Sequence, residues 1–382
     1  MNRLSGLDPQ AQRLIAALRA PHTLSRLPAG EWAALIAAAR AANLVGTLAV
    51  KLAAAGVSAP APAERHLAGA RQLALRQRLS VQWEAHALQA ALGHLGVPVL
   101  LLKGAAYVMS ADGLGAGRMF GDIDVLVPRA ALGDVESALM LAGWVSAAAD
   151  AYDQHYYRTW MHELPPMTHA RRGTVVDVHH TILPLTARNA PDPLRILARS
   201  SPVPGLPALH VPAVENLVIH SITHLVHEGE LHNGLRDLHD IDALLLQFGA
   251  QLGFWSRLLS QAVDNDLAGP LLLGLRLAQA FFDSPVPTDA LAALAKTAGP
   301  IWRRRWLPAV YARALQLDSD APAAWSAQGA RLLIYVRSHA LRMPAPLLAR
   351  HLTIKAWKGL VGRQEPPPPP AATGGRLDID GA

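Results

Sequence analysis

The chain has 382 residues, of which 51% are hydrophobic, and carries a net charge of +6. This length suits two or three domains, and the composition allows a large core to be buried. The absence of cysteine excludes disulfides, thiolate metal sites and cysteine nucleophiles. The positive charge is compatible with a polyanionic partner but does not require one.

No segment has the pattern of a secretory signal or of a membrane span. The longest apolar run, residues 97–102, has the length of a strand and is far too short to cross a bilayer. We therefore expect a cytoplasmic protein with no membrane partner.

Residues 1–95 form a predicted N-terminal helical region. Apolar residues recur at helical spacing over 7–20, 31–56 and 61–95, and prolines separate these segments. Few aromatic residues and abundant alanine and leucine also favour helices.

The pattern changes over residues 96–210, which form a predicted α/β core. The run 97–102 is typical of a buried strand, and a helix over about 104–111, a glycine-rich loop over 112–117 and a strand over 121–127 follow. An amphipathic helix is predicted over 129–142, with further strands within 144–160 and 164–180 around a turn at 171–173. Residues 184–210 are rich in proline and are predicted to be irregular.

Residues 211–363 form a predicted C-terminal helical domain, and the proline-rich residues 364–382 a predicted disordered tail. The order of elements indicates an α+β fold that is predominantly helical, with a small mixed-sheet core flanked by helical regions.

Two carboxylates on the second core strand carry the strongest chemical signal. Asp122 and Asp124 are two residues apart, so both side chains point to one face of the strand. Like charges placed this way usually bind a divalent cation. Asp177, on a later predicted strand, is the best candidate for a third ligand. We expect a pair of Mg²⁺ or Mn²⁺ ions at Asp122, Asp124 and Asp177, which would make these acids catalytic in handling a triphosphate.

The Lys-Gly pair at the end of the first core strand suggests a phosphate-binding turn. Gly104 would let the backbone approach a phosphate, and the helix that starts there would present free N–H groups. Lys103 and Arg118 would supply positive charge, and Gly121 stands at the start of the carboxylate strand. Each feature alone would be read as structural, as an ordinary turn or an exposed acid. Their combination favours a nucleotide-binding site.

These segments resemble the nucleotidyltransferase superfamily of the DNA polymerase beta type. The stretches 101–106 and 122–127, with Arg118 between them, are more closely similar to a bacterial family of uncharacterised nucleotidyltransferases. The resemblance covers roughly residues 60–300 and implies an NTP substrate. It also matches Asp177 and His179 in an Asp-x-His, His220 and His224 on a helix, and a later Asp-Ile at Asp240. One departure is Ala105, where the superfamily usually has a phosphate-binding serine.

Three histidines lie on one predicted helical face, at His220, His224 and His227. A zinc site remains an alternative, but the His-Glu-x-x-His arrangement is missing. We expect His179, His220 and His224 to contact the substrate or to support the site, as the resemblance implies. Arg236 and Asp240 share this region, with an Arg236–Asp237 ion pair as the structural interpretation. His232 and His239 are expected at the surface.

The most basic cluster, Arg303 to Arg305, stands between two tryptophans. It suits either RNA phosphates or a solvated helix face, and we favour the helix face over nucleic-acid binding.

Three functions stay open on the sequence. The first is transfer of a nucleoside monophosphate from an NTP to an acceptor, which is a small molecule, a protein or an RNA. The second is a catalytically inactive scaffold of the same fold, which Ala105 mildly favours and the three acids oppose. The third is a metal-dependent phosphoester hydrolase.

Overall fold

The computed structural model describes residues 7–110, 114–146, 162–317, 325–344 and 353. In this part of the chain the fold is α+β with a helical majority, which confirms the predicted fold class. The predicted tail, most of the first strand segment within 144–160 and the end of the C-terminal helical region lie outside the described residues. No helix among the described residues is long and apolar enough to cross a membrane.

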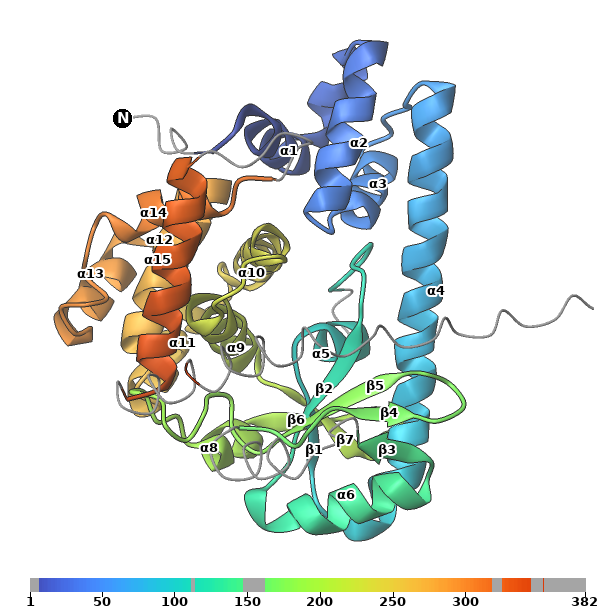
Figure 1. The fold of residues 1–382 in the computed structure, drawn as a ribbon, viewed down its shortest axis with the longest axis vertical. Helices are drawn as coiled ribbons and strands as arrows, with labels where there is room; N and C mark the ends of the chain where they lie inside the picture. The colour runs from blue at the N-terminus through green and yellow to red at the C-terminus, as the bar shows by residue number, and fades with distance from the viewer. Residues whose placement is uncertain (1–6, 111–113, 147–161, 318–324, 345–352, 354–382) are drawn as a thin grey trace, which may run out of the picture.

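The N-terminal region consists of helices, as periodicity predicted, and its longest helix reaches the sheet. The expected segment 31–56 is divided into two helices at Asn43, which has a positive φ of 54°. Figure 1 shows α4 running from the small N-terminal helices to the sheet at the other end of the molecule. The helices are α1 (Pro9–Arg19), α2 (Trp32–Ala41), α3 (Val45–Ala54) and α4 (Ala61–Leu92), with short 3-10 turns η1 (Pro21–Arg26), η2 (Ala29–Glu31) and η3 (Gly93–Leu95).

Seven strands of the described chain form one mixed sheet in the order β3-β4-β5-β2-β1-β7-β6. The pairs β2–β5 and β1–β7 are parallel, and the other neighbours are antiparallel. The strands are β1 (Val99–Leu101), β2 (Asp122–Leu126), β3 (Trp144–Ser146), β4 (Met167–His169), β5 (Val175–His179), β6 (Ser200–Val203) and β7 (Leu206–Pro212). Helices α5 (Lys103–Met109), η4 (Arg129–Ala131), α6 (Leu132–Leu141) and α8 (Pro193–Ala198) connect them.

The prediction that residues 184–210 are irregular was wrong. This segment contains α8, β6 and most of β7, and β7 pairs directly with β1 at the centre of the sheet. Its prolines suggested a loop, but Pro207 of β7 lies outside the two residue pairs that join β7 to β1, and Pro202 lies on the edge strand β6. A proline is tolerated in a strand where its missing N–H is not needed by the ladder.

Arg172 fastens α4 to the β3–β4 end of the sheet. Its guanidinium donates to both carboxylate oxygens of Glu84, over 2.7 and 2.9 Å, and lies over the rings of Trp83 and Trp144. Such a two-pronged arginine–carboxylate pair fixes orientation as well as distance. The long helix is therefore held in one position against this end of the sheet.

The C-terminal region packs around α9. Nearly every residue of this helix is buried, and it contacts α10, α11, α12 and α15. A helix that is buried on all sides must be covered by neighbours. The helices are α9 (Val214–His227), α10 (Gly234–Phe248), α11 (Phe254–Asp264), α12 (Ala268–Phe282), α13 (Thr288–Thr297), α14 (Leu307–Ala314) and α15 (Trp325–Arg342). Buried apolar residues from all three regions form one continuous cluster, and the proposed domain boundaries remain a proposal.

Candidate active site

Three carboxylates project from the same face of two paired strands. β2 and β5 are parallel, and Asp124 lies opposite Asp177 in their register. Asp122 precedes Asp124 by two residues, so both point to the same side of the sheet. The pairing thus gathers acids from two separate segments at one place.

Asp124 is buried and is held by two partners. Its Oδ1 accepts hydrogen bonds from Lys103 Nζ at 2.9 Å and from His179 Nε2 at 3.0 Å. Burial alone would raise the pKa of Asp124, but Lys103 and His179 outweigh it and hold the pKa well below its ordinary value. The protein itself therefore keeps Asp124 ionised.

Asp122 and Asp177 are shifted in the opposite direction. Burial, followed by the charges of Asp124 and Glu163, raises the pKa of Asp177 to about 7. Desolvation and Asp124 also raise the pKa of Asp122, although this residue is exposed and solvent screens part of the effect. One buried oxygen of Asp177 has no hydrogen-bond partner among the described residues. The negative charge of the cluster therefore exceeds what the neighbouring cations neutralise.

The turn between β1 and α5 brings Lys103 to the carboxylates. Lys103 has a φ of +42°, a left-handed conformation that is strained for a residue with a Cβ. Its side chain ends on Asp124, and that ion pair offsets part of the strain. The next residue, Gly104, has no room for a side chain, because a Cβ there would collide with the Arg118 guanidinium and the Phe120 ring. Close packing against Arg118 and Phe120 therefore requires glycine at position 104, a constraint that sequence alone did not suggest.

Arg118 is paired with Asp240 from α10. Its Nε lies 2.7 Å from Asp240 Oδ2, and both side chains are nearly inaccessible. The guanidinium also lies over the rings of Tyr107 and Phe120. Burial would lower the pKa of Arg118, yet Asp240 raises it above its ordinary value, and Arg118 in turn lowers the pKa of Asp240. Much of the charge expected to face a triphosphate is therefore already neutralised inside the protein.

A cavity of about 520 Å³ opens between the carboxylate strand and the helices α9 and α10. This volume is within the range of small-molecule binding sites. The cavity lining combines charged and apolar residues from the start of α5, from β2 and the residues before it, and from α9, α10 and the loop between them. The lining residues are Asn43, Lys103, Gly104, Arg118, Met119, Phe120, Gly121, Asp122, Asp124, His224, Leu225, Glu228, Glu230, Leu231, His232, Asn233, Gly234, Arg236 and Asp237.

The three histidines of α9 lie in different surroundings. His224 lines the cavity, with Glu228 Oε2 at 3.7 Å and Asp237 Oδ2 at 3.8 Å. His220 is buried and is not part of the lining; burial and then Lys103 lower its pKa to about 3. His227 is buried against Trp302 and its Nδ1 is 2.9 Å from the Thr223 carbonyl oxygen. Within the described chain they join no cluster of three metal-ligating side chains.

The structure also places the remaining candidates. Arg236 and Asp237 form an ion pair of 2.9 Å at the cavity wall. His232 is exposed, but the prediction of a surface position for His239 was wrong: it is buried with its ring against Phe282. The basic residues 303–305 are exposed but lie between α13 and α14 rather than on a helix face, because Pro300 and the following turn interrupt the helical pattern.

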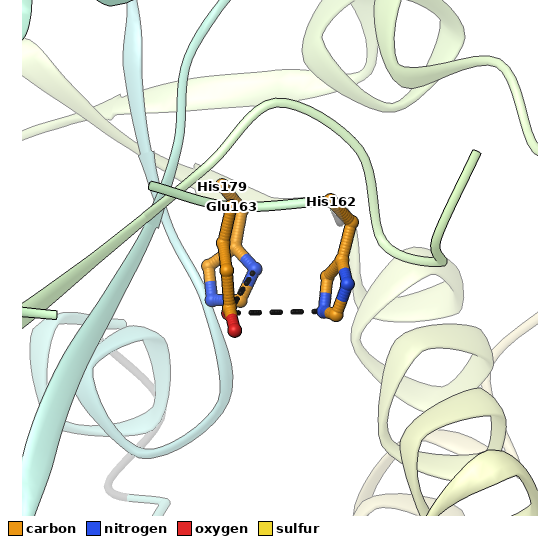
Figure 2. Close-up of side chains that lie close together, drawn as sticks. All are labelled: His162, Glu163 and His179. Carbon is orange, nitrogen blue, oxygen red and sulfur yellow. Dashed lines mark ion pairs between the residues drawn. The ribbon is translucent and has the colours of Figure 1, made fainter. Parts of the chain in front are cut away.

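Sequence reasoning missed two side chains beside the carboxylates, His162 and Glu163. Glu163 forms an isolated bridge with His179, and its Oε2 lies 3.3 Å from His179 Nδ1 and 3.8 Å from His162 Nε2. Figure 2 shows both imidazoles presenting a nitrogen to the Glu163 carboxylate. Burial raises the pKa of Glu163 although His179 opposes the shift. A His-Glu pair next to two prolines has no local pattern that would have pointed to this position.

Comparison with known proteins gives one result that bears on this site. No curated protein and no solved structure matches the chain. A family model described as "Uncharacterised nucleotidyltransferase" matches residues 28–283, which contain both the carboxylate strands and the cavity. That match covers more than half of the sequence, and the chain therefore belongs to the uncharacterised nucleotidyltransferase family.

Proposed function

We propose that the protein is a metal-dependent nucleotidyltransferase that moves a nucleoside monophosphate from an NTP to an acceptor. The observation that carries the proposal is the alignment of Asp124 with Asp177 on parallel strands, with Asp122 on the same face and a cavity alongside. The family supports the general activity, and nucleotidyltransferases generally use divalent metals. The acceptor is a small molecule, a protein side chain or an RNA.

The residues present fit a hard divalent cation. The candidate ligands are carboxylate oxygens, which Mg²⁺ and Mn²⁺ prefer, and one buried oxygen of Asp177 lacks a partner. Asp122, Asp124 and Asp177 would hold the ion. When bound, it would neutralise phosphate charge and stabilise the departing pyrophosphate.

The protein's own groups would prepare this site. Lys103 and His179 orient Asp124 through its Oδ1, so that the other carboxylate oxygen is free of these two bonds. Arg118, held by Asp240, shapes the wall beside Gly104 and acts as a positioning residue. His224 and Arg236 line the cavity on the side of α9 and α10, where they would contact the nucleotide or the acceptor.

The raised pKa values argue against a pure scaffold. Ionised Asp177 costs folding stability when no cation is bound, because burial and repulsion by Asp124 disfavour its charged form, and the exposed Asp122 adds a smaller cost that solvent screens in part. A protein that only needed the fold would be more stable with neutral residues at these positions. Ala105 is buried and offers no hydroxyl, so we assign the phosphate contacts to Lys103 and the cavity wall instead.

The test uses the four NTPs labelled at the α-phosphate, with Mg²⁺ and with pools of RNA, protein or small metabolites as acceptors. We expect labelled product and pyrophosphate only when an acceptor pool is present. Losing a residue that only supports a metal ligand typically lowers activity roughly 10- to 100-fold. Asp122→Asn removes a proposed ligand itself and should lower the rate of nucleotide transfer by more than that. The matched control is Asp289→Asn, an exposed aspartate on α13.

Two other results would contradict nucleotide transfer and favour a different function. Acceptor-independent release of nucleoside monophosphate or phosphate, lost in Asp122→Asn, would indicate a hydrolase. Nucleotide binding without turnover across all pools would favour the scaffold.

A further inference from the structure

A second group of potential metal ligands lies next to the carboxylates but differs from them in chemistry. His162, Glu163 and His179 each present one ligand atom, and these atoms lie within 4.8 Å of one another. Two imidazole nitrogens and one carboxylate oxygen make a softer donor set than three carboxylates. Asp122, Asp124 and Asp177 contribute no atom to this group.

The hydrogen bond between His179 and Asp124 decides which nitrogen of His179 is available. Nε2 lies 3.0 Å from Asp124 Oδ1, and a carboxylate only accepts, so Nε2 carries a proton. Nδ1 then faces Glu163 Oε2 at 3.3 Å. Nδ1 is buried and has no hydrogen-bond partner among the described residues. A carboxylate that holds one imidazole nitrogen, so that the other is available to an ion, is the usual support of a metal-bound histidine.

His162 completes the group, and Figure 2 shows it apart from Glu163 and His179, with a dashed line to the Glu163 carboxylate. Its Nε2 lies 3.8 Å from the same Glu163 oxygen, and its ring is 5.2 Å from that of His179. Both imidazoles thus converge on one oxygen at separations too long for good hydrogen bonds. Atoms bound to a common ion are spaced in this way, because the ion lies between them.

We propose that His162, Glu163 and His179 bind a divalent transition-metal ion of the zinc class, at a site distinct from the carboxylate site. Two histidines and one glutamate are a known donor combination for zinc, with a fourth position left to water or substrate. The ion holds the His179 ring in place through Nδ1 and therefore supports the orientation of Asp124. This last role rests on the proposed function, whereas the binding itself does not.

The experiment titrates metal-stripped, full-length protein with Zn²⁺ by calorimetry in excess Mg²⁺, and repeats the titration with Co²⁺ by absorption spectroscopy. We expect one tight Zn²⁺ per chain and cobalt bands typical of nitrogen and oxygen ligands. Glu163→Gln and His162→Gln should each weaken Zn²⁺ binding at least about tenfold and abolish the cobalt bands. His22→Gln, an exposed histidine in η1, is the matched control and should bind like the wild type.

Asp122→Asn separates this proposal from the proposed function. It should lose nucleotide transfer while it retains Zn²⁺ affinity, because Asp122 is not a ligand of the second site. The proposal is overturned if both His162→Gln and Glu163→Gln, with wild-type circular dichroism, bind Zn²⁺ as tightly as the wild type. It is equally overturned if Zn²⁺ binding is lost in Asp122→Asn, which would place the ion at the carboxylates, or if excess Mg²⁺ displaces it.

Discussion

Asp124 and Asp177 lie opposite each other on parallel strands, yet their pKa values move in opposite directions. Two cationic or donating side chains, Lys103 and His179, hold Asp124, whereas a buried oxygen of Asp177 has no partner among the described residues. Asp124 is thus ionised by the protein alone. Asp177 needs a further cation if its ionised form is not to lower the stability of the fold.

Asp177→Asn should abolish nucleotide transfer and make the metal-free protein more stable. The folded-state pKa of about 7 lies above the unfolded value, so ionised Asp177 destabilises the fold increasingly as pH rises from about 4 to 7. Removing the charge should raise the unfolding midpoint at pH 8 in a chelator. Thermal unfolding by circular dichroism measures this change, and a fall in the midpoint would instead mean that Asp177 is a structural hydrogen-bond acceptor.

Asp122→Asn and Asp124→Asn should both be inactive but should differ in stability. Asp122 is exposed, so its replacement should change the free energy of unfolding by no more than about 0.5 kcal/mol. Asp124→Asn leaves the largely buried Lys103 ammonium without its counter-charge and should cost about 3 kcal/mol. Urea denaturation compares the two variants. Equal stabilities would show that the Lys103–Asp124 pair contributes little.

Gly104→Ala and Gly121→Ala should have unequal effects although both residues line the cavity. A Cβ at Gly104 meets Arg118 and Phe120, whereas a Cβ at Gly121 meets no atom within 4 Å. Displacing Arg118 and Phe120 to make room for the new methyl group should lower the free energy of unfolding by about 1–3 kcal/mol, as overpacking usually does. Denaturant midpoints should therefore fall only in Gly104→Ala, and a neutral result there would mean that Arg118 can readily move away.

His227→Gln should reduce the pH dependence of stability in acid. Burial lowers the folded-state pKa of His227 to about 4, although its hydrogen bond to Thr223 opposes the shift. The unfolded chain therefore binds the extra proton first, so this contribution to stability is complete above about pH 6.5 and is lost as pH falls towards 4. The wild type should lose about 3 kcal/mol more than the variant between pH 7 and 4, measured by urea denaturation. Parallel pH profiles would contradict a buried neutral histidine.

Some features of the candidate site could be predicted because they depend on neighbours along the chain. The two-residue spacing of Asp122 and Asp124 places them on one face wherever that strand lies, and the apolar run before Lys103 marks a buried strand. The helix periodicity likewise located α4 and marked the C-terminal region as helical, although it did not separate the individual helices. The prediction that residues 184–210 are irregular was wrong because it rested on their proline content. Whether a proline disrupts a strand depends on which N–H groups the sheet requires, and the sequence does not show this.

The sequence by itself determined the fold class, the carboxylate strand and the Lys-Gly turn, since local spacing and periodicity encode these features. Only the tertiary structure decided that Arg118 is neutralised by Asp240, that His224 rather than His220 lines the cavity, and that Glu163 lies against His179. Each of these depends on how segments far apart in the chain pack together. Such packing is set by burial and by the pairing of charges in three dimensions, which no periodicity along the sequence records.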